Sequence, residues 1–541
     1  MERGLRRHAA WLLVAAAYLF ASPYFERINN PNENVRIWAT RAIVEHHVLA
    51  IDEVQREWGW VNDKAKTDRH VYSGKAPGTT FLGVPVLYLH TKLRHFVGWK
   101  SPDKAETTFW LRLFAVKLPV LAFLWAFARW VERATGSPRA RDLLVGALGL
   151  GTMLYPYGVL FVGHALAAAA AFSAFMLLDL FDTDLGASPR VALGRLAAAG
   201  FFAGLTVLFE YQAALIAAAL AVYAAVRARG RALAFVAGAL PPAVALGAYH
   251  TALFGRPWRW PYAYIENPGF AAAHHSAGFH GLTLPHLAAF PSALVSPAYG
   301  LFAFSPVLAV GVVGAVLLWR RGPQRYAVLV AAIAVTMILF LSGMQNWRAG
   351  WCVGPRYIAA LVPFLLLPLV KLWPAYATRW WAPALVVGLT IPSIFLNVIS
   401  GAVYPHYPEQ FDNPVFDLTL PLLGAGYAPY GLGWLLRLRG AWAMVPLALV
   451  TLAAIALPAA GDDDGDQGQG HAHAHDHDHQ GRGGPWRQVA LSLAVAFVYL
   501  GALAAYGRRP SVAEAAATAT VRQLWEPPPA VKSSGRSSPA P

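Results

Sequence analysis

Apolar stretches of about twenty residues recur from one end of this chain to the other, with short polar or basic segments between them. The first runs from Ala9 to about Ser22, and the next convincing one begins near Phe109. A helix of this length crosses a hydrocarbon layer of roughly 30 Å. The stretches lack the alternation of barrel strands. We therefore predict an all-α polytopic membrane protein with about eleven to thirteen transmembrane helices.

The composition agrees, because 57% of the 541 residues are hydrophobic and 13% are charged. That is more apolar surface than one soluble core buries. Lys and Arg clusters between the apolar stretches carry the net charge of +15, a pattern of membrane topology and not of nucleic-acid binding. Arg3, Arg6 and Arg7 predict a cytoplasmic N-terminus. The first apolar stretch then acts as a signal anchor, and the polar interval up to about Asp103 lies outside.

The loop lengths divide the chain into one large module and a C-terminal part. We expect a transmembrane module over 1–440, with outer loops at about 24–105, 254–300, 344–356 and 400–440. After it we expect a helix over 441–460, a low-complexity Asp/His-rich loop over 461–486, a last helix over 487–507 and a disordered tail over 508–541. Alternation of spans places this tail outside, whereas Arg508 and Arg509 favour the inside, so the topology after Gly440 stays open.

The longest polar interval of the N-terminal half runs from Asn29 to Val84, just outside the first span. We predict an amphipathic helix that begins at Asn30-Pro31 and lies along the membrane surface. Its apolar face comprises Val35, Trp38, Ala39, Ala42 and Ile43. Glu33 near its start fits two roles: a carboxylate that forms a capping box with Asn30, or a general base held at a fixed place.

Two cations follow turns at the membrane surface. Lys75 lies in the turn Gly74-Lys75-Ala76-Pro77-Gly78, ahead of an apolar segment. In the third outer loop, NWRAGWCVGPRY, Gly354 and Pro355 break the helix and expose Arg356. A lysine at such a place binds a lipid phosphate as a point charge, and the arginine fork suits a phosphate or pyrophosphate. The alternative for both is a long side chain that reaches the interface without a ligand.

Together these segments resemble the membrane glycosyltransferases of the GT-C type. The likeness is nearest to the bacterial branch of the lipid A aminoarabinose transferase and the RgtA/B/C/D-like enzymes, which is dolichyl-phosphate-mannose mannosyltransferase-like. Asn32-Glu33 with Arg36 matches that branch's acidic pair and its Arg-bearing helix, and Lys75-Ala76-Pro77 matches its Lys-Pro-Pro turn. The Gly-Pro-Arg-Tyr motif of the third loop and the stretch SPAYGLFAFSP, 296–306, are also similar.

One departure bears on the chemistry. Asn32 stands where the branch has the Asp that usually serves as catalytic base. The resemblance therefore leaves three possibilities: Glu33 takes over as the base, Asp52, Asp63 or Asp68 does, or the activity is lost.

The resemblance implies a bacterial inner-membrane enzyme with its active site on the extracytoplasmic side. It would move a sugar, with inversion, from a polyprenyl-phosphate carrier to a lipid, glycan or protein acceptor, and membrane lipids would surround it. Glu33 would take the acceptor's proton, while Lys75, Arg356 and Arg348 would bind the departing lipid phosphate. No cofactor is required, and the sequence gives no support for a divalent metal in this site.

Two alternatives stay open: a transporter or flippase of lipid-linked sugars, and a catalytically degenerate member of the family. An inverted repeat is not visible in the sequence, and charges within the spans are few, which counts against transport.

The outer segments hold further candidates for substrate contact, namely Arg36, Asp63, Asp68, His164 and His274. Glu210 interrupts an apolar run, and we expect it to mark an outer turn between two short helices. A separate group of alternating histidines offers ligands for zinc, nickel or copper, namely His471, His473, His475, His477 and His479. Its glycine-flanked register fixes no geometry, so we expect a flexible, weakly metal-binding linker that catalysis does not need.

Overall fold

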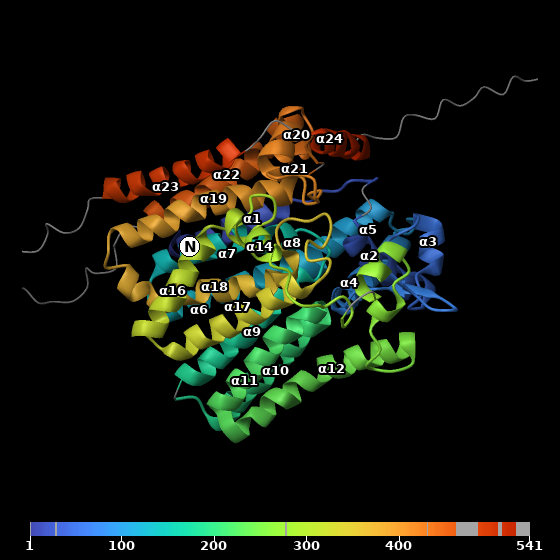
Figure 1. Ribbon diagram of the computed structural model, residues 1–541, viewed down its shortest axis with the longest axis horizontal. Helices are drawn as coiled ribbons and strands as arrows, with labels where there is room; N and C mark the ends of the chain where they lie inside the picture. The colour runs from blue at the N-terminus through green and yellow to red at the C-terminus, as the bar shows by residue number, and fades with distance from the viewer. Residues whose placement is uncertain are drawn as a thin grey trace, which may run out of the picture.

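The computed structural model describes residues 2–27, 30–184, 186–275, 278–429, 431–460, 485–506 and 511–525. Within these ranges, nine helical stretches are long and apolar enough to cross a membrane, and one of them, Tyr211–Phe254, contains two helices. The prediction of an all-α polytopic membrane protein is confirmed. Shorter apolar helices lie beside the nine, so the number of spans stays a prediction. The long helices run side by side, and α2 to α5 gather at one end of them (Figure 1).

The long helices are α6 (Leu118–Thr135), α9 (His164–Thr183), α10 (Pro189–Phe209), α11 (Ala214–Ala228), α12 (Leu233–Phe254), α17 (Gln324–Gly343), α18 (Val362–Tyr376), α19 (Trp381–Val403), α22 (Val445–Ala460) and α23 (Pro485–Tyr506). Packed among them are α1 (Glu2–Phe20), α7 (Pro138–Leu150), α8 (Leu154–Gly158) and α16 (Val307–Arg321). The connecting segments hold α13 (Pro268–His275), α14 (Ala289–Val295), α15 (Leu301–Phe304), α20 (Leu420–Gly424), α21 (Leu432–Leu435), the 3-10 turns η3 (Tyr211–Ala213), η4 (Arg229–Ala232), η5 (Pro261–Tyr264), η6 (Arg356–Leu361) and η8 (Gly440–Met444), and the π-helical turn η7 (Val415–Thr419).

Several helix ends follow directly from local sequence. Ser137 and Ser188 are the N-caps of α7 and α10, and each accepts a hydrogen bond from a backbone N–H in the first turn. A proline follows each serine, at the position where a missing N–H costs nothing. Gly136 and Gly255 end α6 and α12 with φ of 66° and 78°, the left-handed conformation that glycine adopts most easily.

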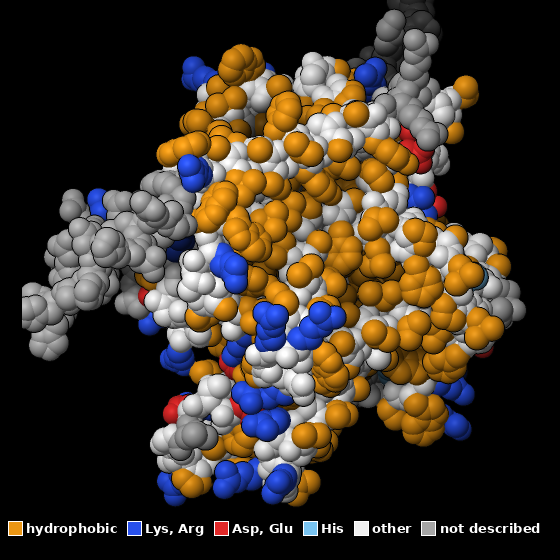
Figure 2. Space-filling model, turned by 60° about the vertical axis from the view of Figure 1, so that its left-hand side comes forward, with side chains coloured by type: hydrophobic (Ala, Val, Ile, Leu, Met, Phe, Trp, Pro, Cys, Tyr) orange, Lys and Arg blue, Asp and Glu red, His pale blue; other side chains and the backbone are white. Residues whose placement is uncertain are grey.

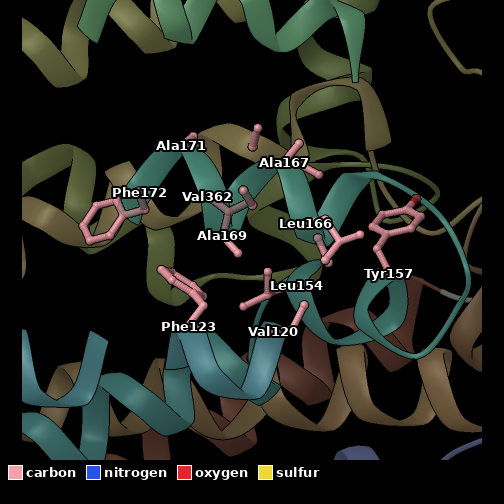
Figure 3. Close-up of a cluster of buried hydrophobic side chains, with 14 of the residues drawn as sticks. Val120, Phe123, Leu154, Tyr157, Leu166, Ala167, Ala169, Ala171, Phe172 and Val362 are labelled. Atoms are coloured by element: carbon pink, nitrogen blue, oxygen red, sulfur yellow. The ribbon is translucent and has the colours of Figure 1, made fainter. Parts of the chain in front are cut away.

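The core is built around α9, whose first half is rich in alanine. Figure 3 shows Ala167, Ala169 and Phe172 of α9 facing side chains from α6, α8 and α18. Phe172 is fully buried, and its ring lies 5.1 Å from that of Phe364 and 5.4 Å from that of Trp130. Small side chains let the neighbouring helices approach closely. This packing fixes the start of α9, and with it the first residue of the helix, His164.

At the other end of α9 a buried polar cluster joins four helices. The carboxylate of Asp179 accepts hydrogen bonds from Trp130 Nε1 at 2.9 Å, Tyr326 Oη at 2.5 Å and Lys371 Nζ at 2.8 and 2.9 Å. These donors come from α6, α17 and α18. Asp179 is 3% exposed, and its charge is matched by Lys371. The cluster ties the bundle together at the end opposite His164.

Apolar side chains also cover much of the outside. On α11 and α12, Val226, Leu233 and Val244 are 69%, 75% and 65% exposed. Figure 2 shows a face on which hydrophobic side chains predominate, with Lys and Arg gathered over its lower part. Such a surface is costly in water and suits lipid.

The first polar interval folds into a compact unit at the end of the bundle. It contains α2 (Pro31–Arg41), a π-helical turn (Ala42–His46), α3 (Asp52–Trp58), a hairpin of β1 (Lys64–Lys66) and β2 (Val71–Ser73), and α4 (Gly78–Phe96). The strands are antiparallel, with Lys64 opposite Ser73 and Lys66 opposite Val71. The predicted helix at Pro31 is present. However, every residue from Asn32 to Arg41 is buried, because α4 and the hairpin pack against this helix.

The C-terminal tail departs from the prediction. The sequence predicts disorder over 508–541, but the structure contains α24 (Val512–Trp525). Ser511 and Glu514 start this helix, because each side chain accepts a hydrogen bond from the other residue's backbone N–H. The Trp525 ring lies 4.6 Å from that of Phe25 and stacks on that of Tyr404 at 5.8 Å. The prediction is therefore wrong for 512–525, and α24 lies at the same end as the first outer interval. Residues 461–484 and 526–541 are outside the described residues.

Candidate active site

A cavity of about 420 Å³ lies where the polar segments meet at this end of the bundle. The start of α2, the β-hairpin with its following turn, and the first residue of α9 line it. So do the turn between α10 and α11, η5 with α13, the loop after α17 with the start of η6, and the segment after α19. A cavity lined by segments so far apart in the sequence, with charged groups converging on it, is the default candidate for a ligand site.

Asp63 and Lys75 face each other in this cavity across the base of the hairpin. Their Oδ2 and Nζ atoms are 3.1 Å apart, and their side chains are 12% and 18% exposed. Asp63 has a φ of 60°, a strained conformation for a residue other than glycine. Gly74 permits the arrangement, because a Cβ there would lie 2.6 Å from the Asp63 carbonyl oxygen.

The surroundings of Asp63 and Lys75 shift the pKa of both side chains. Burial disfavours the charged form of Asp63, but Lys75 and Arg356 outweigh it, so the pKa of the carboxyl lies below its ordinary value. Burial lowers the pKa of the Lys75 ammonium, and Asp63 opposes that shift. The pair thus lies in a cavity that a ligand can enter, and each partner favours the charged form of the other.

Arg356 lines the same cavity at the start of η6. The preceding Gly354 has a φ of 62°, and a Cβ there would lie 2.8 Å from the sulfur of Met153. Arg356 Nε is buried and has no hydrogen-bond partner, and the guanidinium forms no ion pair with any described residue. Arg348, in the same outer loop, does not line the cavity, and its guanidinium lies 5.6 Å from the ring of Tyr299.

The floor of the cavity is formed by Glu210 and His164, whereas Arg36, which the sequence offers as a substrate contact, lies beneath them and does not line the cavity. Glu210 ends α10 and precedes η3, so the prediction that it marks a turn between two helices is confirmed. Its Oε1 accepts a hydrogen bond from Arg36 Nη2 at 2.9 Å and lies 3.5 Å from His164 Nδ1. Arg36 is fully buried beneath it and also donates to the side chain of Asn32, which lines the cavity. Asn32 stands where the resembling branch has an Asp, and it is hydrogen-bonded to Arg36. Glu210 balances the charge of that arginine.

Glu33 has a different environment from the one its sequence suggests. Asn30 makes no side-chain capping bond, so the capping box is not formed. Instead the Glu33 oxygens accept hydrogen bonds from Arg112 Nε at 2.7 Å and Nη2 at 2.6 Å, and from the Phe161 N–H at 2.6 Å. Burial opposes ionisation, yet Arg112 and these bonds lower the pKa of the Glu33 carboxyl. Glu33 is 3% exposed and does not line the cavity.

The remaining sequence candidates are distributed unevenly. His274 lines the cavity, and its ring stacks on that of Tyr262 at 5.2 Å. Asp68 is exposed and lies outside the cavity lining, as does Asp52, which is 3.4 Å from His70 Nδ1. The histidines at 471–479 lie outside the described residues, and among the described residues no group of three or more His, Cys, Asp or Glu side chains could hold a metal ion.

Sequence reasoning missed several residues of this region. Tyr262 and His406 line the cavity, and burial lowers the pKa of His406 to about 4. Arg112, the partner of Glu33, lies in an apolar run at the start of a π-helical turn, Arg112–Lys117, between α5 (Lys104–Leu111) and α6. A charge within an apolar run was the available signal for Arg112. No signal in the sequence distinguished Tyr262 or His406, because aromatic and polar loop residues are common at membrane interfaces.

Comparisons with known proteins give distant structural matches. No family model and no curated protein matches the chain. Among solved structures, it is similar to the oligosaccharyltransferase AglB of Archaeoglobus fulgidus in complex with an inhibitory peptide and a dolichol-phosphate. The identity is 13% and the TM-score 0.43, over 74% of this chain and 56% of that one.

The chain is also similar to ArnT of Cupriavidus metallidurans. The apo structure matches with 14% identity and a TM-score of 0.40 over 92% of this chain and 76% of that one. The structure bound to undecaprenyl phosphate matches with 14% identity and a TM-score of 0.40 over 84% and 77%. Because these TM-scores are low, we interpret the site from its own residues.

Proposed function

We propose that this protein is a GT-C-type membrane glycosyltransferase, which moves a sugar from a polyprenyl-phosphate carrier to an acceptor hydroxyl at the extracytoplasmic face. The observation that carries the proposal is the charge pattern of the cavity. Asp63 faces Lys75 and Glu210 faces Arg36, which leaves Arg356 without an ion-pair partner among the described residues.

An unpaired arginine in a recess of a membrane protein is costly unless a ligand brings the opposite charge. A phosphate suits this place, because its oxygens match the planar fork of Arg356 while Lys75 supplies a point charge. The cavity lies at one end of a bundle whose outer surface suits lipid, so we expect a polyprenyl chain to bring its phosphate there from the membrane. Lys75 and Arg356 thus form the proposed phosphate clamp.

Asp63 is the proposed general base. Among Glu33, Asp52, Asp63 and Asp68, the four acids that the sequence left open, Asp63 is the one that lines the cavity. The acceptor oxygen attacks the anomeric carbon while Asp63 takes the hydroxyl proton. The bond from that carbon to the phosphate oxygen breaks, and its electron pair leaves with the carrier phosphate, whose charge Lys75 and Arg356 stabilise. The family resemblance adds the expectation of inversion.

The transporter alternative receives less support. Transport needs a route to the other side, and the bundle is tied together opposite the cavity by the Asp179 cluster, whose groups satisfy one another. The degenerate-enzyme alternative rested on Asn32, but the cavity is lined by three carboxylates, Asp63, Glu210 and Glu409.

The test is release and transfer of radiolabelled sugar from polyprenyl-phosphate sugars by the purified full-length protein in detergent. We expect transfer by the native chain, and loss in Asp63→Asn, Lys75→Ala and Arg356→Ala. Glu53→Gln is the matched control, because Glu53 forms an exposed pair with Arg56 on α3, away from the cavity. Binding of the carrier without turnover of any donor would overturn the enzyme and favour transport or scaffolding.

A further inference from the structure

The cavity floor, which the phosphate clamp and the base do not use, has the features of a carbohydrate site. His164 is 3% exposed, lines the cavity, and its Nε2 atom is buried without a hydrogen-bond partner. Glu210 beside it is 8% exposed, and its Oε2 has one weak partner, Gln212 Nε2 at 3.3 Å. Buried polar atoms without good partners are costly unless a ligand satisfies them.

The backbone is shaped to hold this arrangement. A Cβ at Gly163 would lie 2.6 Å from Glu210 Oε1 and 2.3 Å from the carbonyl oxygen of Phe209. Any side chain at position 163 would therefore displace Glu210 from the start of α9. The Tyr157 ring packs 4.9 Å from the His164 ring and fixes its other side. Figure 3 shows Tyr157 beside the first turn of α9, at the edge of the core.

The charge around the floor selects the ligand. Glu210 is already neutralised by Arg36, which lies fully buried under it at 2.9 Å. Lys75 and Arg356 line the same cavity. A cationic group at the floor would therefore meet several positive charges, and both buried carboxylates of the lining, Asp63 and Glu210, already have cationic partners. The third acid of the lining, Glu409, is exposed and is not part of this buried floor. A neutral group that both donates and accepts hydrogen bonds meets no such penalty.

Two aromatic side chains also line the cavity. Tyr262 and His274 line the cavity as a stacked pair, with ring planes 22° apart. Apolar ring faces beside hydrogen-bonding side chains match a pyranose or furanose, which presents C–H groups on its faces and hydroxyls on its edge.

We infer that Glu210 and His164 form the subsite for the transferred sugar, and that this sugar is neutral, a hexose or pentose whose hydroxyls bond to both residues. The inference rests on the proposed function, because it takes the carrier phosphate to lie at Lys75 and Arg356. It differs from the resemblance to aminoarabinose transferases, which would suggest a cationic sugar.

The test compares three ligands by thermal stabilisation and by sugar release, in full-length protein. They are polyprenyl phosphate alone, carriers loaded with a neutral hexose or pentose, and the same carriers with one sugar hydroxyl replaced by an amine. We expect a neutral donor to bind better than the bare carrier, and to bind and react at least about tenfold better than its amine analogue. Glu210→Gln and Gly163→Ala should lose this sugar-dependent gain and leave binding of the bare carrier unchanged. His164→Gln, which keeps a polar atom near Nε2, should retain more of the gain than His164→Leu.

Two results would overturn the subsite alone. One is an amine donor that binds as well as its neutral partner. The other is a Glu210→Gln variant that weakens the bare carrier as much as the loaded one, which would place Glu210 on the phosphate side. If none of the ligands binds, the proposed function fails together with the subsite. Glu53→Gln again serves as the control that should behave as the native chain.

Discussion

Two ion pairs at the same end of the bundle show how differently a carboxylate and a cation can be used. Glu33 and Arg112 meet through two hydrogen bonds, and their side chains are each 4% exposed. Arg112 also donates to the Pro23 carbonyl at 2.6 Å, and the Phe161 N–H donates to Glu33. Asp63 and Lys75 meet at one contact of 3.1 Å on the wall of a cavity.

In these two pairs, the geometry of the pairing separates a structural role from a functional one better than residue type does. The Glu33–Arg112 pair joins α2 to the end of the first long helix and to the turn before α9, and leaves little capacity for a ligand. The Asp63–Lys75 pair keeps several lone pairs and protons unused and faces open space. The first is suited to holding the fold, and the second to binding and proton transfer.

The largest expected effect is a loss of stability when the Glu33–Arg112 ion pair is broken. Glu33→Gln leaves Arg112 as a buried charge without its partner, so we expect the free energy of unfolding to fall by about 3–5 kcal/mol. Denaturation in detergent, followed by tryptophan fluorescence, measures it. The control Glu53→Gln, in an exposed pair, should change it by less than about 1 kcal/mol. Equal losses in both variants would remove the distinction.

Removing the unpaired cation should weaken ligand binding. Arg356→Ala is expected to reduce affinity for polyprenyl phosphate about 10- to 100-fold, because a charge-assisted contact to phosphate is lost. Arg348→Ala is the matched control from the same loop, since Arg348 does not line the cavity. A loss in Arg348→Ala equal to that in Arg356→Ala would return Arg348 to the clamp that the sequence predicts.

Restoring an acid at position 32 should do little. Asn32→Asp places a second carboxylate beside Arg36, whose charge Glu210 already balances. We therefore expect sugar transfer to change by less than about fivefold, in contrast to the loss predicted for Asp63→Asn. A much larger gain, in the same radiolabel assay, would show that the base belongs at position 32 and that Asp63 is not its replacement.

The smallest expected effect is a change in how the melting temperature depends on pH in acidic solution. The pKa of Glu33 in the folded protein lies below its ordinary value of 4.5, so its contribution is complete above that value and is lost as the pH falls through the folded pKa. The melting temperature of the native chain should therefore fall more steeply below about pH 4.5 than that of Glu33→Gln. Parallel curves would mean that the folded structure does not lower the Glu33 pKa.

The sequence predicted much of the bundle, because apolar length alone identifies membrane helices. It also predicted Lys75, Arg356, His164 and His274, whose positions after turns or at helix starts place them in outer segments, and all four line the cavity. Asp63 was one of four acidic residues among which the sequence did not identify the base. Partners could not be predicted, since Arg112 lies 79 residues from Glu33 and Glu210 lies 174 residues from Arg36.

The helix at 512–525 was missed for a related reason. Its composition resembles that of a disordered tail, and its order depends on distant aromatic partners such as Phe25 and Tyr404. Local pattern gives the elements, whereas contacts between remote segments decide which charged groups are closed off and which face the cavity.

We propose that Asp63 acts as the base in the cavity, whereas Glu33 stabilises the fold. The most direct measurement is sugar transfer per folded molecule, with Asp63→Asn and Glu33→Gln purified side by side as monodisperse protein. We expect Asp63→Asn to lose at least about 100-fold in transfer while unfolding close to the native temperature. We expect the folded fraction of Glu33→Gln to transfer sugar within about threefold of the native chain, because a base that contributes about 100-fold or more is still present. The reverse result, with Glu33→Gln folded but inactive and Asp63→Asn active, would contradict this division of roles.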